Sequence, residues 1–189
     1  MNTHFDLIAI GGGSGGLAVA ETAAQYGKRV AIIESRKLGG TCVNNGCVPK
    51  KIMWYAANLA HAVDDAADFG IAATRGTTDW QKLVAGRQAY IARINDYWDG
   101  YVDDSGITRI EGTARFVDAR TVEVDGRAFT ADHIVIATGG RPIMPPVPGA
   151  GLGITSDGFF ELAYGNAGFT GRHVVHDGNY IGIRRAQAL

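Results

Sequence analysis

The order of apolar and polar positions divides the chain into short buried strands that alternate with helices. An apolar run at 5–10 predicts a buried strand, and a second run at 29–34, which ends in an acid, predicts another. Between them, residues 17–26 have helical spacing, and Gly27 is a helix stop. Strands that alternate with helices indicate an α/β fold with a parallel sheet.

The rest of the chain continues in helices and then changes period. Helical spacing at 52–67 and 80–101 predicts two further helices. From 107 to 129 the apolar period shortens to two, which predicts a small antiparallel meander with Asp125-Gly126 as a hairpin turn. A last buried strand starts at His133 and stops at a glycine pair. We therefore predict a Rossmann-like domain, with a parallel sheet, helices and the meander.

A glycine-rich turn follows the first strand directly. Gly11, Gly13 and Gly16 satisfy the pattern G-x-G-x-x-G, and Glu34 follows 18 positions after Gly16. In a dinucleotide site the first glycine allows the tight turn, the second lets the backbone approach a pyrophosphate, and the third lets helix and strand pack closely. The helix start offers N–H groups to the phosphates, and the acid binds a ribose hydroxyl. A glycine-rich turn without a ligand is the alternative.

The two cysteines of the chain, Cys42 and Cys47, have four residues between them. A disulfide across so small a ring removes little entropy from the unfolded chain, so it suits a redox role better than a structural one. Cys47 lies where a helix begins, and a helix N-terminus favours the thiolate form of a cysteine. Inert buried thiols or half of a metal site are the alternatives. The metal-site interpretation is less favoured, because metal-binding cysteine pairs usually have a shorter spacing and the chain has no second cysteine pair.

Composition and charge limit the partners and the cellular location that we expect. The 189-residue chain has a formal net charge of −1 with both signs mixed along it, which argues against a nucleic-acid or membrane-surface partner. No apolar run is long enough to span a bilayer, and the N-terminus lacks a signal-peptide pattern, so we expect a cytoplasmic protein. In that compartment a disulfide is more often catalytic than structural.

Together, these motifs resemble the pyridine nucleotide–disulfide oxidoreductase family, and within it the glutathione reductases. Pro49-Lys50-Lys51 followed by Met53-Trp54 resembles the glutathione reductases, whereas mercuric reductases and lipoamide dehydrogenases usually have Ser before a single Lys. The segments that carry the resemblance are 11–18, 38–51, 137–142 and 156–160.

The resemblance implies FAD as the cofactor, bound by the first Rossmann unit. It also implies NADPH as electron donor, glutathione disulfide as substrate and a homodimer in the full-length family. Carried over position by position, the residues that line FAD are Gly11, Gly13, Ser14, Gly15, Gly16, Glu34, Ser35, Gly40, Thr41, Cys42, Lys50, Thr113, Ala114, Thr138, Gly139 and Arg141.

The same resemblance implies three catalytic residues. Cys47 is expected to lie against the flavin and exchange electrons with it. Cys42 is expected to be the thiol that attacks the substrate disulfide. Lys50 is expected to stabilise the reduced, anionic flavin electrostatically.

Ser14, Glu21 and Trp98 are expected to border the substrate, and two of them depart from the family. Glu21 stands where Arg or Asn is frequent, and Trp98 stands where Tyr is common. An acid that faces a substrate carboxylate weakens binding. Either a neighbour compensates for Glu21, or the substrate preference differs.

We assign residues 1–162 to an incomplete FAD-binding domain with the redox-active disulfide. Residues 163–189 are assigned to an aberrant linker and the start of an NADPH-binding Rossmann unit, with a strand at 172–175 and a helix at 180–189. The glycine pattern between them is damaged, because Asp177 and Asn179 take glycine positions. We therefore expect a corrupted or frameshifted tail on a truncated fragment that is inactive alone and retains FAD weakly. Another family member, of mercuric or thioredoxin type, and a non-enzymatic nucleotide-binding remnant are the alternatives.

Overall fold

The computed structural model describes residues 3–162, 174–177 and 180–183. The chain divides into two compact units, which we describe separately. The first contains residues 1–44 and 91–140, and the second contains residues 45–90 and 141–189.

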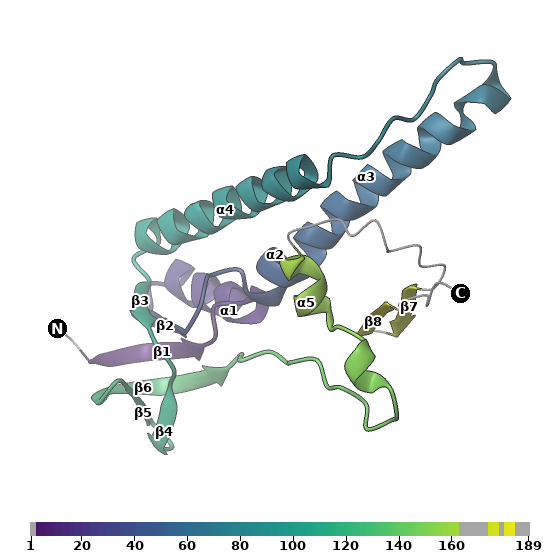
Figure 1. Ribbon diagram of the computed structural model, residues 1–189. Coiled ribbons are helices and arrows are strands. Elements are labelled where there is room, and N and C mark those ends of the chain that lie inside the picture. Colours follow the sequence, from purple (N-terminus) through teal and green to yellow (C-terminus); the bar gives the residue numbers. More distant parts are fainter. Residues whose placement is uncertain (1–2, 163–173, 178–179, 184–189) are drawn as a thin grey trace. The chain divides into compact units, whose positions relative to one another are not determined.

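The first unit is built on a six-stranded sheet in the order β3-β2-β1-β6-β5-β4 (Figure 1). Its strands are β1 (His4–Ile10), β2 (Val30–Glu34), β3 (Thr108–Glu111), β4 (Arg115–Asp118), β5 (Thr121–Val124) and β6 (Arg127–Ile136). The strands β3, β2, β1 and β6 run parallel, whereas β4, β5 and the start of β6 form an antiparallel meander. The predicted Rossmann-like α/β class with a small meander is therefore confirmed, but β3, which was predicted within the antiparallel meander, instead pairs parallel with β2 at the other edge of the sheet.

Strand β6 belongs to both parts of the sheet. It begins at Arg127, six residues before the strand predicted from the sequence, because its first residues pair with β5 across the predicted Asp125-Gly126 turn. Both turn residues have positive φ, 49° and 77°, as a tight hairpin requires. Strand β5 pairs only with residues 127–130 of β6. Among the described elements, the same edge of β6 beyond that point has no strand partner, and Ile136 is 67% exposed.

Apolar side chains cover both faces of this sheet. On one face, helix α1 (Ser14–Gln25) and the C-terminal part of α4 (Trp80–Asp104) pack against β1 and β2 (Figure 1). The buried residues of this layer are Ala9, Leu17, Ala20, Val30, Ile32, Leu38, Val102 and Ile107. The meander closes over the other face, where Phe5, Ile8, Ile10, Ala31, Ile33, Val122, Val124, Phe129 and Ala131 are buried. A fold with both faces covered explains why β1 and β2 are almost continuously apolar.

A buried asparagine holds helix α2 (Gly40–Asn45) to α4. The side-chain nitrogen of Asn95 donates to the carbonyl of Leu38 at 2.9 Å and to the side-chain oxygen of Asn44 at 3.1 Å. Asn44 in turn donates to the carbonyl of Gly40 at 2.9 Å. These contacts span more than fifty positions of sequence and fix the segment that contains Cys42.

The second unit contains α3 (Cys47–Asp65), the short helix η1 (Ala66–Phe69), the start of α4, η2 (Ala150–Leu152) and α5 (Ser156–Glu161). Arg87 of α4 is almost completely buried and donates to the carbonyl of Phe160 in α5 at 2.8 Å. Its burial lowers the pKa of its guanidinium. Asn45 also contacts α5, by donating to Asp157 at 3.3 Å. Polar contacts therefore attach α5 within this unit.

The tail differs from the sequence-based prediction where the structure describes it. Residues 174–177 form strand β7, and residues 180–183, predicted to begin a helix, form strand β8, which pairs antiparallel with β7. The helix prediction at 180–183 is therefore wrong. Tyr and Ile in that segment favour a paired strand over a single helical turn. The expected linker at 163–171 and the expected helix beyond residue 183 lie outside the described residues.

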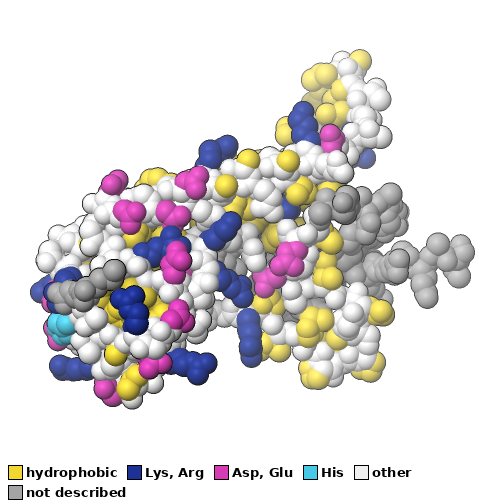
Figure 2. Space-filling model, turned by 60° about the vertical axis from the view of Figure 1, so that its left-hand side comes forward, with side chains coloured by type: hydrophobic (Ala, Val, Ile, Leu, Met, Phe, Trp, Pro, Cys, Tyr) yellow, Lys and Arg dark blue, Asp and Glu magenta, His cyan; other side chains and the backbone are white. Residues whose placement is uncertain are grey.

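Two further features concern the expected partners: the distribution of surface charge, and the length and apolar character of the helices. Figure 2 shows acidic and basic side chains interspersed over the face that it displays. Within the described ranges, no helix has the length and apolar character needed to cross a bilayer.

Replacing Asn95 tests the contact that holds α2. We expect Asn95→Asp to lower the free energy of unfolding at pH 7 by about 2 to 3 kcal/mol, because a buried carboxylate cannot donate to Leu38 or Asn44. Asn58→Asp is the matched control, since Asn58 is exposed and donates only to the carbonyl of Trp54. The control change is expected within about 0.5 kcal/mol. Urea unfolding measures both, and equal losses would contradict the role of Asn95.

Candidate functional site

The carboxyl ends of parallel strands meet at one edge of the sheet in the first unit. Gly11 follows β1 and donates to the carbonyl of Ile33 in β2 at 2.8 Å, and Ala137 follows β6 and donates to the carbonyl of Ile10 at 2.8 Å. Ligands of open α/β sheets bind outside this edge. The sequence-predicted cofactor residues that end or follow β1, β2, β3 and β6 are Gly11, Gly13, Ser14, Gly15, Gly16, Glu34 (the last residue of β2), Ser35, Thr113, Ala114, Thr138 and Gly139.

Two glycines of the loop after β1 have no room for a side chain. Gly11 has φ +107°, and a Cβ added there would lie 2.3 Å from the carbonyl oxygen of Ala137. A Cβ added to Gly16 would lie 1.7 Å from the carbonyl oxygen of Gly11. Helix α1 therefore starts in direct contact with the backbone that ends β1, which is the close packing expected of the third glycine.

The start of α1 presents backbone donors at this edge. Gly13 is the N-cap with an extended backbone, and no side chain caps the helix. The first bond of the helix runs from the N–H of Leu17 to the carbonyl of Gly13 at 2.9 Å. The N–H groups of residues 14–16 have no acceptor within the helix, so they can bind an anion.

Glu34 ties the loops after β1 and β2 together. Its Oε2 accepts a hydrogen bond from the N–H of Gly12 at 2.7 Å, and its Oε1 accepts one from the N–H of Arg36 at 2.8 Å. Each carboxylate oxygen has a second lone pair, so a ribose hydroxyl can still donate to it. The acid thus joins the glycine loop to the loop after β2, a function that sequence reasoning missed.

Helix α2 lies against the glycine loop. The N–H of Gly39 donates to the carbonyl of Gly12 at 2.8 Å. Gly40 has φ +56°, and a Cβ added there would lie 2.7 Å from the Cα of Gly13. Backbone contacts with the glycine loop therefore position the segment that contains Thr41 and Cys42. The side chain of Cys42 is half-buried.

Cys47, Lys50 and Arg141 belong to the second unit. Helix α3 begins at Cys47, as predicted, with Gly46 as its N-cap and the buried Pro49 in its first turn, where proline is tolerated. Cys47 and Lys50 are exposed. The pairing of Cys42 with Cys47 and the role of Lys50 stay predictions.

A pocket of about 160 Å³ in the first unit is lined by the three residues predicted to border the substrate, Ser14, Glu21 and Trp98. Tyr101, which sequence reasoning missed, donates from its hydroxyl to Oε1 of Glu21 at 2.6 Å. Its position three residues after Trp98, on the same side of α4, was the available signal.

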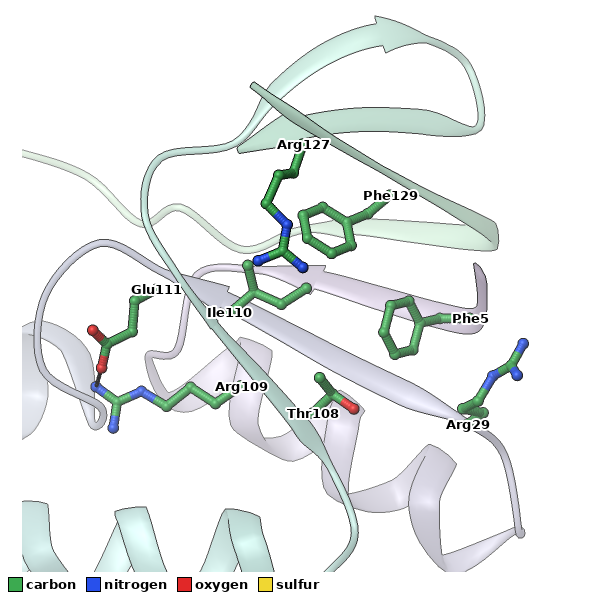
Figure 3. A pocket seen from close by; sticks show the side chains of 8 residues that line it. All are labelled: Phe5, Arg29, Thr108, Arg109, Ile110, Glu111, Arg127 and Phe129. Atoms are coloured by element: carbon green, nitrogen blue, oxygen red, sulfur yellow. Dashed lines mark ion pairs between the residues drawn. The ribbon is translucent and has the colours of Figure 1, made fainter. Parts of the chain in front are cut away.

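A larger cavity of about 610 Å³ lies beside the other face of the sheet and was not predicted (Figure 3). Its arginines already have partners. Arg109 pairs with Asp99 at 2.6 Å and with Glu111 at 3.2 Å. The guanidiniums of Arg29 and Arg127 lie over the rings of Phe5 and Phe129, at 5.9 and 5.3 Å respectively. Its walls include the start of β1 and the residue before β2, at the edge opposite to the glycine loop.

Adding a methyl group at two neighbouring glycines tests the close contact of α1. We expect Gly16→Ala to lower the free energy of unfolding by about 3 kcal/mol or more, because its Cβ would overlap the carbonyl of Gly11. Gly15→Ala is the matched control, since a Cβ at Gly15 meets nothing within 4 Å. That variant is expected to be unchanged or more stable by up to about 1 kcal/mol. Thermal unfolding by circular dichroism compares the two, and tolerance of Gly16→Ala would refute the contact.

Comparison with known proteins identifies relatives of this chain. The chain is 48% identical over 167 residues to the glutathione reductase of Schizosaccharomyces pombe, which covers 84% of this chain and 36% of that relative. It is 43% identical over 162 residues to the glutathione reductase of Nostoc sp., which covers 86% and 35%. It is 43% identical over 177 residues to the glutathione reductase of Burkholderia cepacia, which covers 94% and 38%. The chain thus spans little more than a third of the length of these relatives.

The family match itself is broader than these alignments suggest. Residues 5–189 match the family described as pyridine nucleotide-disulphide oxidoreductase, and this range includes the segment after Leu162. The match covers nearly the whole chain and contains both the glycine loop and α2. The chain therefore belongs to the pyridine nucleotide-disulphide oxidoreductase family.

Proposed function

We propose that this chain forms the FAD-binding, disulfide-bearing part of an NADPH-dependent glutathione-disulfide reductase. The observation that supports this function best is the contact between α2 and the glycine loop, in which Gly39 donates to Gly12 at 2.8 Å. It brings a thiol-bearing helix to a dinucleotide-type loop at the edge where α/β sheets bind ligands. The names of the three relatives support glutathione disulfide as the substrate.

The residues at this edge fit FAD. The N–H groups that open α1 suit a pyrophosphate, and Glu34 has lone pairs left for a ribose. The space outside Gly15 is open, since an added Cβ would meet nothing within 4 Å. When bound, FAD supplies two-electron transfer between NADPH and the protein disulfide. Thr41, Thr138 and the other predicted cofactor residues are proposed to line it.

The proposed chemistry of the protein is thiol–disulfide exchange. The Cys42 thiolate attacks one sulfur of glutathione disulfide, so the substrate S–S bond breaks, a mixed disulfide forms and one glutathione leaves. The Cys47 thiolate then attacks the Cys42 sulfur, which releases the second glutathione and forms the Cys42–Cys47 disulfide. Two electrons and a proton from NADPH, with one further proton, return that disulfide to two thiols. Lys50 is proposed to supply positive charge beside the cofactor. NADPH binding, a homodimer and a cytoplasmic location are proposed for the longer protein.

Titration of the 189-residue chain with FAD tests the cofactor part of this function. We expect weak but saturable binding, measured by the change in flavin fluorescence. Glu34→Gln is expected to weaken it at least about tenfold, because the carboxylate is lost as a charged acceptor. Glu123→Gln, on the exposed side of β5, is the charge-matched control. A folded chain that does not bind FAD would refute the proposal.

The flavin spectrum tests the two cysteine roles separately. If Cys47 lies against the flavin, its thiolate gives a long-wavelength absorbance band with the oxidised flavin, and in the wild type this band appears once two-electron reduction has opened the Cys42–Cys47 disulfide. Without added reductant, we expect Cys42→Ser, in which Cys47 is a free thiol, to show this band and Cys47→Ser to lack it. The reverse pattern would exchange the two roles, and a band in both variants would contradict the assignment.

A further inference from the structure

The small pocket of the first unit contains one acid and no base. Its lining residues are Ser14, Leu17, Ala18, Glu21, Gly39, Val43 and Trp98. Glu21 is the single charged side chain in this lining. Glutathione disulfide carries carboxylates, so an acid in the pocket is the wrong charge for that part of the molecule. Glu21 is the right charge for a cation.

Tyr101 holds Glu21 without neutralising its charge. Its hydroxyl donates to Oε1 of Glu21 at 2.6 Å, and the side-chain nitrogen of Gln25 donates to the same oxygen at 3.3 Å. Among the described residues, no hydrogen bond ends on Oε2, so this oxygen is available to a ligand. The hydrogen bond to Glu21 raises the pKa of Tyr101, which keeps the tyrosine protonated as a donor.

The other walls suit an ammonium group on a short alkyl chain. Trp98 is half-buried and is fixed edge-on against Tyr101, with ring centroids 5.7 Å apart. An indole attracts a cation through its ring electrons. Ser14 adds a hydroxyl acceptor, and the apolar Leu17 and Val43 line the remainder. A volume of about 160 Å³ accommodates such a group but not a whole peptide.

We propose that this pocket binds a protonated primary amine of the disulfide substrate, a group that glutathione disulfide carries at its γ-glutamyl ends, and not one of the substrate carboxylates. This inference rests on the proposed disulfide reductase function. Glu21 is the specificity-determining residue, Trp98 faces the cation, and Tyr101 is a positioning residue that acts through Glu21. A disulfide that must place a carboxylate in this pocket binds more weakly.

Binding of two unreactive probes to the 189-residue chain tests the proposal. Hexane-1,6-diamine has the chain length of a bis-ammonium disulfide, and octanedioate has that of the matching dicarboxylate. Neither contains sulfur, so neither reacts with cysteine. Trp98 serves as the reporter: saturable quenching by the diamine is expected in the wild type and absent in Trp98→Phe. Octanedioate is expected to give no saturable change. Equal responses to the two probes would overturn the proposal.

Variants of Glu21 test its role. Glu21→Gln is expected to weaken diamine binding at least about tenfold, because the charge of the acceptor is lost. Glu21→Lys is expected to reverse the preference in favour of octanedioate. Glu123→Gln, a charge-matched change on β5, is expected to stay within about twofold of the wild type. Circular dichroism melts verify that each variant is folded. Unchanged diamine affinity in folded Glu21→Gln would overturn the proposal.

A double-mutant cycle separates positioning from structure. Tyr101→Phe is expected to weaken diamine binding about threefold through the loss of one hydrogen bond. In the Glu21→Gln background the same change is expected to have no further effect, because Tyr101 acts through the carboxylate. Additive losses would refute the positioning role.

The diamine measurements need neither flavin nor turnover. Their failure can therefore be distinguished from a failure of the proposed reductase function. Loss of FAD binding with intact diamine binding refutes the reductase function and leaves the amine pocket. FAD binding without a preference for the diamine refutes the amine pocket alone.

Discussion

The site depends on one backbone contact, between the start of α1 and the end of β1. A methyl group at Gly16 would lie 1.7 Å from the carbonyl oxygen of Gly11, so the two segments touch without any side chain between them. This approach aims the first turn of α1 along the carboxyl edge of the sheet. The donors of that turn then face the space outside the sheet where the loops after β2, β3 and β6 also end.

The second constraint follows from the first. Because the glycine loop is fixed, its carbonyl at Gly12 can accept from Gly39, and its N–H at Gly12 can donate to Glu34. The predicted redox helix and the predicted ribose acid are therefore held by one residue of the same loop. Asn95 completes this support from α4. The glycine loop and the segment that contains α2 are therefore joined by hydrogen bonds and do not merely lie next to each other.

Local sequence signals predicted much of this structure. The start of α4 at Trp80 and the Asp125-Gly126 hairpin turn lie where they were predicted, since helical spacing and turn residues are local signals. The continuity of β6 was missed because its first half is stabilised by β5 and its second half by β1. The hydrogen bonds of Asn95 and Tyr101 join residues fifty or more positions apart, and no spacing rule reports such partners. Glu21 was noticed only as a departure from a family pattern, and its partner required the fold.

The open edge of β6 has a consequence for handling this chain. The N–H of Ala131 still donates to the carbonyl of Arg120 at 3.0 Å, but beyond residue 131 this edge of β6 pairs with no strand in the described part of the chain, and the apolar Ile136 is exposed. Such an edge is a template for intermolecular strand addition, and Asp132 and His133 are the polar side chains that oppose it. Concentrated solutions of the polypeptide are thus prone to oligomers joined sheet to sheet.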